Sequence, residues 1–193
     1  MSLNTSLYTI SAVLILDNEG SRLYANYYQN KPQAHQKDTT HVINSEFQTT
    51  AQQLKFEKSV FPKINKVHQD IVLYDNHLIT YKQTNDVILI VVSKINENES
   101  LIYSVVANLF ESLNILLSNT VDKSTILSKY DLVTLAVDET VDDGVLIEID
   151  PAIIVSRVTK APEANVKIEV NSNTLFNAFK IAQRIGDKLQ QGL

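Results

Sequence analysis

The 193-residue chain contains no cysteine and only four glycines, and each shortage excludes a class of function. Without cysteine there is no disulfide, no thiolate nucleophile and no thiolate metal ligand, which is compatible with a reducing compartment. The glycines have no spacing that would form a dinucleotide-binding turn or a phosphate loop; they are Gly20, Gly144, Gly186 and Gly192. Nucleotide-binding motifs of these two kinds are therefore absent.

Basic charge and long hydrophobic runs are also scarce. The chain has 17 Lys and Arg against 22 Asp and Glu, a net charge of -5, whereas binding to phosphate backbones or anionic lipid generally needs a basic excess. No apolar run approaches the roughly 20 residues of a membrane span, and the first 20 residues predict a strand and a turn rather than a signal peptide. The sequence therefore predicts neither nucleic-acid binding nor direct membrane docking.

What the chain does contain is a regular order of strands. Apolar runs bounded by turn residues predict strands at residues 8–16, 21–28, 70–75, 77–84 and 86–94. Residues 13–16 and 87–92 are apolar without alternation, which is typical of strands buried on both faces. These two strands are predicted to lie in the middle of a sheet, with helices on both sides.

Helices are predicted between and after the strands. A short helix is expected at 48–61, ended by Pro62, and residues 99–118 repeat apolar side chains at helical spacing. Asp150 and Pro151 predict the cap and first position of a helix that runs to about 159, and an amphipathic helix is expected at 173–190. Another helix is predicted at 124–143, with these residues facing inward: Leu127, Leu132, Leu135, Ala136 and Val141.

The element order predicts an α/β fold, a three-layer sandwich on a five-stranded antiparallel sheet with helices on both faces, plus a C-terminal helical tail. Residues 29–50 are polar and without period, so they are predicted to form a mobile loop. Residues 160–193 are predicted to be a linker and the last amphipathic helix.

Carboxylates crowd residues 135–151, LAVDETVDDGVLIEIDP. A helix ending at Gly144 would carry acidic side chains in its last turn, where the helix dipole disfavours them. A calcium loop centred on Gly144 would place Val141 at a ligand position, and an exposed tip offers no burial to separate two carboxyl pKa values. A solvated acidic tip and a partner-binding surface remain as the two main interpretations.

Other signs of catalysis or metal binding are weak. The four histidines form no pair at i, i+4 spacing, and no glycine-flanked serine suggests a nucleophile elbow. The sequence therefore predicts no catalytic residue, no metal site and no cofactor. The candidate partner-binding residues are Asp138, Glu139, Asp142, Asp143 and Glu148.

Four stretches resemble a known family: residues 7–28, 56–61 (FEKSVF), 135–151 and 155–158 (VSRV). They are similar to the small chains of vesicle coats, the family of the coatomer zeta subunits and the sigma chains of clathrin adaptors. The segment LAVDE...DDGV...E is the most specific part of the likeness. The resemblance covers residues 7–28 and about 54–159, so residues 29–50 correspond to a family-variable insertion.

The resemblance implies a longin-type domain over residues 1–159 and a non-enzymatic, cytoplasmic role. The expected function is that of a small structural subunit of the COPI coat in Golgi-to-ER and intra-Golgi transport. It implies a heterodimer with the coatomer gamma large chain, contact with other coatomer subunits, and indirect recruitment by an Arf-family GTPase. Membrane contact is expected only peripherally, through the coat, on Golgi membranes and COPI vesicles.

Two alternatives belong to other functional classes. The chain could be a stand-alone longin-like binding module or regulator, which would behave as a free monomer with a weak, transient partner. It could also bind sorting signals, as some sigma chains do, although no motif in the sequence indicates a binding pocket for them.

Overall fold

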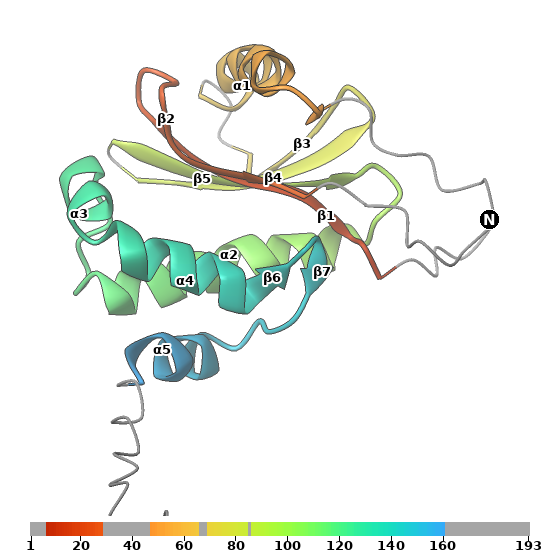
Figure 1. Cartoon of the computed structure of the whole chain (residues 1–193). Coiled ribbons are helices and arrows are strands. Elements are labelled where there is room, and N and C mark those ends of the chain that lie inside the picture. The colour runs from red at the N-terminus through yellow and green to blue at the C-terminus, as the bar shows by residue number, and fades with distance from the viewer. Residues whose placement is uncertain (1–6, 29–46, 66–68, 85, 161–193) are drawn as a thin grey trace, which may run out of the picture. The chain divides into compact units, whose positions relative to one another are not determined.

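The computed structural model describes residues 7–28, 47–65, 69–84 and 86–160. It confirms the predicted fold class: a five-stranded antiparallel sheet lies between one helix on one face and a group of helices on the other (Figure 1). The part of the tail beyond residue 160, with the helix predicted at 173–190, lies outside the described residues.

The strands run in the order β2-β1-β5-β4-β3, so β5 is central and β1 lies beside it. Every residue of β1 is buried, and so are all residues of β5 except the last, which confirms the predicted burial of these strands on both faces. The bounds are β1 Ile10–Asp17, β2 Arg22–Tyr27, β3 Ile71–Tyr74, β4 His77–Gln83 and β5 Val87–Lys94.

Helix α1 (Thr50–Ile64) covers one face of the sheet and begins with a capping box between Thr49 and Gln52. The prediction that Pro62 ends this helix was wrong, because the helix continues to Ile64. Proline removes one backbone donor, but the fully buried Ile64 and the hydrogen bond from Asn65 N–H to the Phe61 carbonyl hold the last turn.

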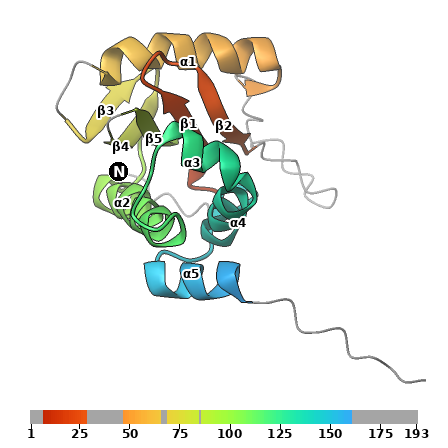
Figure 2. The ribbon, with the colours of Figure 1, turned by 90° about the vertical axis from the view of Figure 1, so that its left-hand side faces the viewer.

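The other face is covered by α2 (Glu99–Leu116) and α4 (Tyr130–Thr140), with α3 (Lys123–Ser128) beside them. Helix α5 (Pro151–Thr159) packs on α2 and α4 on the side away from the sheet (Figure 2). Asp150 caps α5 as predicted, since its carboxylate accepts the N–H groups of Ala152 and Ile153 at 2.8 and 3.2 Å.

The single helix predicted at 124–143 is two helices, α3 and α4, separated at Lys129. Lys129 leaves the helical conformation, with φ -117° and ψ 39°. The helical periodicity is therefore interrupted, and the positions that face the core in α4 do not continue those of α3. Leu127 and Leu135 are consequently 52% and 46% exposed, although both were expected to face inward. The buried apolar positions are Ile126, Val133, Ala136, Val137 and, after α4 has ended, Val141.

The polar loop was predicted at 29–50, but it ends earlier than residue 50. Residues 29–46 lie outside the described residues, but Phe47 is only 4% exposed. Its ring packs against Tyr27, Phe56 and His77, with centroid distances of 5.0, 4.9 and 5.3 Å. Phe47 therefore belongs to the core between α1 and the sheet.

Deleting residues 31–46 is expected to leave the melting temperature within a few degrees of the parent. Closure entropy rises slowly with loop length, and the Tyr27 and Phe47 rings on either side of the deletion are in contact. Extending the deletion to include Phe47 should cost about 3–5 kcal/mol, because a core aromatic is lost. Thermal circular dichroism of both deletions checks this; a large fall for the shorter one would contradict it.

Candidate functional site

The segment that carries the candidate carboxylates contains a β-hairpin after α4. Helix α4 ends at Thr140, and Val141–Asp142 (β6) pairs with Val145–Leu146 (β7). Asp143 and Gly144, with φ of 46° and 84°, form the two-residue loop between them. The prediction that the helix runs to 143 and stops at Gly144 was therefore wrong, and Asp142 and Asp143 are not in its last turn.

The hairpin is held against the beginning of β1 and the end of β2. The Gly144 carbonyl accepts the N–H groups of Thr9 and Ile10, both at 3.1 Å, and Tyr8 forms a bridge with Val145. The Tyr28 hydroxyl donates to the Val141 carbonyl at 3.4 Å. These bonds place Asp142 and Asp143 beside β2.

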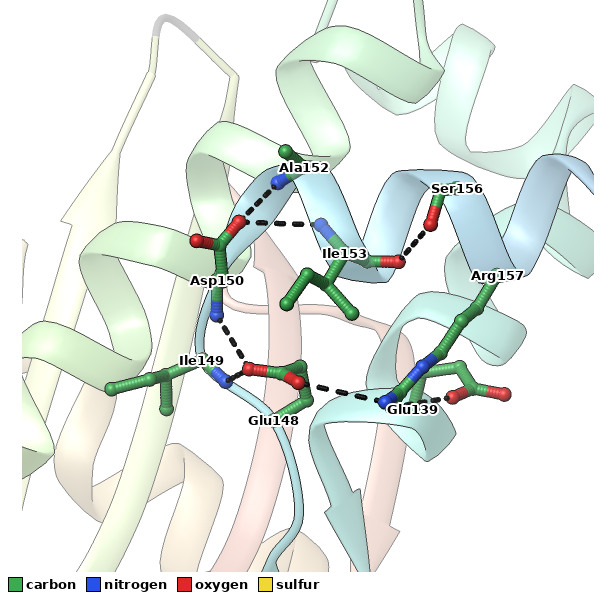
Figure 3. A network of polar contacts seen from close by, with 8 residues as sticks. All are labelled: Glu139, Glu148, Ile149, Asp150, Ala152, Ile153, Ser156 and Arg157. Atoms are coloured by element: carbon green, nitrogen blue, oxygen red, sulfur yellow. Dashed lines mark hydrogen bonds and ion pairs between the residues drawn. The ribbon is translucent and has the colours of Figure 1, made fainter.

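Two of the five candidate carboxylates, Glu139 and Glu148, bind a cation of the same chain. The guanidinium of Arg157 on α5 lies 3.4 Å from Glu139 and 3.6 Å from Glu148 (Figure 3). The other oxygen of Glu148 accepts the N–H groups of Ile149 and Asp150 at 3.0 and 3.1 Å. Glu139 therefore links α5 to α4, and Glu148 links α5 to the segment that precedes it, internal roles that the sequence analysis missed because Arg157 is distant in the chain.

The other three, Asp138, Asp142 and Asp143, line a shallow hollow of about 330 Å³. Asn26, Tyr27, Tyr28 and Val141 complete its lining, and none of these residues is basic. Among the described residues no ion pair reaches any of the three carboxylates. We call Asp138, Asp142 and Asp143 the acidic rim of this hollow.

The acidic rim is electrostatically unfavourable in the free chain. Partial burial raises the pKa of Asp138, and the negative charges of Asp142 and Glu139 raise it further. Burial and the nearby Asp138 carboxylate also raise the pKa of Tyr24, on β2, to about 12. A cation placed in the hollow would relieve this repulsion.

A second hollow, of about 500 Å³, lies beyond the C-terminal end of α2. Its lining is mostly polar and includes Asp86, Asn114, Asn119 and Asp122. No motif in the sequence marks these residues as a group. Within the described part of the chain, no cluster of three or more His, Cys, Asp or Glu is placed to hold a metal ion.

Comparisons with known proteins give one consistent result. The family model "Clathrin adaptor complex small chain" matches residues 9–165. The chain is 37% identical to "Coatomer subunit zeta" of Saccharomyces cerevisiae, over 97% of this chain and 98% of that protein. It is 40% identical to human "Coatomer subunit zeta-2", over 79% of this chain and 66% of the relative.

A structural comparison agrees at the level of the fold. A homology model of the full-length AP-3 complex in a stretched open conformation contains a chain that matches with a TM-score of 0.54. The match has 18% sequence identity and covers 77% of this chain and 90% of that chain.

Proposed function

The chain belongs to the clathrin adaptor small-chain family, among the coatomer zeta subunits, and we propose that it is the small structural subunit of a COPI coat. The observation that carries the proposal is the 37% identity to a coatomer zeta subunit over 97% of the chain. The proposed coat would act in vesicle transport from the Golgi to the ER and within the Golgi. The family consists of structural coat subunits, so we propose no enzymatic activity.

The proposed direct partner is the coatomer gamma large chain, on whose solenoid trunk the longin-like domain, residues 1–159, would be seated. Other coatomer subunits would contact the pair, and an Arf-family GTPase would recruit the assembly. Among the described residues no helix is long and apolar enough to cross a membrane. From the likeness to coatomer zeta subunits, we propose that the protein is cytoplasmic and reaches Golgi membranes and vesicles peripherally, through the coat.

Co-purification from cytosol tests this function. A tagged full-length chain should retain a large helical-repeat subunit at equal stoichiometry through gel filtration. A stand-alone binding module would instead elute as a free monomer, and that result would reject the proposed assembly.

We further propose that the acidic rim faces basic groups of a coat partner. The support is that no ion pair reaches the acidic rim from the part of the chain that the structure describes, in contrast to Glu139 and Glu148, which Arg157 already neutralises in part. Because these last two side chains are engaged within the chain, we assign them to the stability of α5 and reserve partner contact for Asp138, Asp142 and Asp143.

Replacing Asp142 and Asp143 together with Asn is expected to weaken binding to the large partner, with the loss shrinking as salt rises. Each exposed charge pair contributes roughly 0.2–1 kcal/mol, so the double change should raise Kd about two- to thirtyfold at low ionic strength. The matched control is Glu111→Gln with Asp131→Asn, two exposed acids on α2 and α4 outside the hollow. Equal Kd for both double variants, measured by calorimetry, would mean that the rim is only solvated.

A further inference from the structure

Strand β2 forms one outer edge of the five-stranded sheet (Figure 2). It pairs with β1, and no strand lies on its other side among the described residues. An unpaired edge presents a row of backbone N–H and C=O groups, and such edges accept an extended peptide as an added strand.

The register shows which backbone groups are available. The Tyr28 N–H donates to the Ser11 carbonyl, and Asn26 lies opposite Val13 in the ladder with β1. Because antiparallel pairing alternates along a strand, the N–H and C=O groups of Ala25 and Tyr27 point away from β1. These groups are the ones that an added strand would bind.

The two ends of β2 differ in charge. The acidic rim shares its hollow with Asn26 and Tyr27, so three carboxylates that have no ion-pair partner among the described residues lie at the C-terminal end of β2. At the other end, Arg22 is engaged by the buried Glu57, with its Nε 3.0 Å from one carboxylate oxygen. An incoming basic segment would therefore meet attraction at one end of β2 and a largely neutralised cation at the other.

The opposite edge, β3, offers a poorer site for the same ligand. It has four residues where β2 has six, and none of its residues lines either hollow. At about 3.3 Å per residue, the length of β2 matches an extended segment of roughly six residues. Burial and the negative charges of Asp142 and Glu139 raise the pKa of Asp138, and a positive charge docked beside this carboxylate would offset that repulsion.

We propose that the free edge of β2 docks an extended basic segment of a partner coat subunit as an added strand, with Lys or Arg side chains against Asp138, Asp142 and Asp143. This inference rests on the proposed coat function and specifies how the acidic rim is used. Main-chain hydrogen bonds to Ala25 and Tyr27 would provide the docking geometry, and the acidic rim would select for positive charge.

The probe is a capped peptide of alternating Lys and Val, Lys-Val-Lys-Val-Lys-Val, titrated into the isotope-labelled full-length chain. The expected result is salt-sensitive binding, with amide shifts centred on Ala25 and Tyr27 and no comparable binding of the Glu-Val counterpart. Asp138→Asn with Asp142→Asn should weaken binding by about two- to thirtyfold, as expected for two rim charges. Asp131→Asn, an exposed acid on α4 outside the hollow, should have no effect.

The backbone part of the site is tested by Ala25→Pro, which removes an outward N–H at an edge position where proline is tolerated. Peptide binding should be lost while the circular dichroism spectrum stays native. If this variant unfolds, the map of amide shifts and the binding of the Asn variants still test the β2 edge site. Shifts centred elsewhere, equal binding of the Glu-Val peptide, or binding that appears only after residues 31–46 are deleted would overturn the inference. Co-purification of the Asn variants with the large coat subunit separates the two proposals, since a failed peptide test with an intact assembly rejects only the edge site.

Discussion

Ile90→Asp is expected to abolish folding. Ile90 is fully buried in the central strand β5, where it lies between Leu14 of β1 and Tyr81 of β4 and contributes to the core under α1. Losing the side chain costs about 2–5 kcal/mol, and burying even a neutral carboxyl without a partner costs about 2–7 kcal/mol more. The sum is comparable to the whole stability of a typical domain, about 5–15 kcal/mol.

Leu73→Asp is the matched control, because Leu73 lies in the edge strand β3 and is 55% exposed. That variant should express solubly and melt within a few degrees of the parent. Soluble Ile90→Asp protein with a native circular dichroism spectrum would contradict the burial of β5 between two layers of helices.

The sheet could be predicted from the sequence because its signals are local and strong. An unbroken apolar run such as residues 87–92 requires cover on both faces, and Asp75 and Asn76 supply the positive φ of a tight hairpin between β3 and β4. The error at Pro62 arose because tertiary burial of Ile64 outweighed a local helix-breaking signal. The exposed Leu127 and Leu135 show that periodicity alone cannot locate a break such as the one at Lys129.

The candidate site was harder to predict because two local signals compete there. Acidic residues and apolar spacing favour a helix through residue 143, whereas Asp143-Gly144 between Val141 and Val145 is also a hairpin signal. The hairpin prevails because its loop carbonyl bonds Thr9 and Ile10, far away in the sequence. The sequence also could not show that Glu139 and Glu148 are paired within the chain while the acidic rim has no ion pair among the described residues. That pairing depends on Arg157, which lies beside α4 only because α5 packs there.

Gly144→Ala is expected to destabilise the free protein by about 2–5 kcal/mol, because it combines an αL penalty of roughly 1–2 kcal/mol with a steric clash of about 1–3 kcal/mol. Gly144 has φ +84°, and a Cβ there would lie 2.7 Å from the Ile10 carbonyl oxygen and 3.2 Å from Cβ of Tyr28. The obstacle is backbone, so it cannot move aside without disturbing the start of β1. Chemical denaturation measures the loss.

Gly144→Asn separates the two causes. Asparagine tolerates positive φ better than alanine, so it would recover most of the stability if conformation alone were the problem. A Cβ is present in both variants, and the approach of Ile10 to Gly144 is fixed by the hydrogen bonds from Thr9 and Ile10 to the Gly144 carbonyl. We therefore expect Gly144→Asn to remain destabilised by more than about 1 kcal/mol, within the range for overpacking. Parent-like stability of the Asn variant would show that β1 can yield, and that the hairpin carrying Asp142 and Asp143 is less firmly held beside β2 than its contacts indicate.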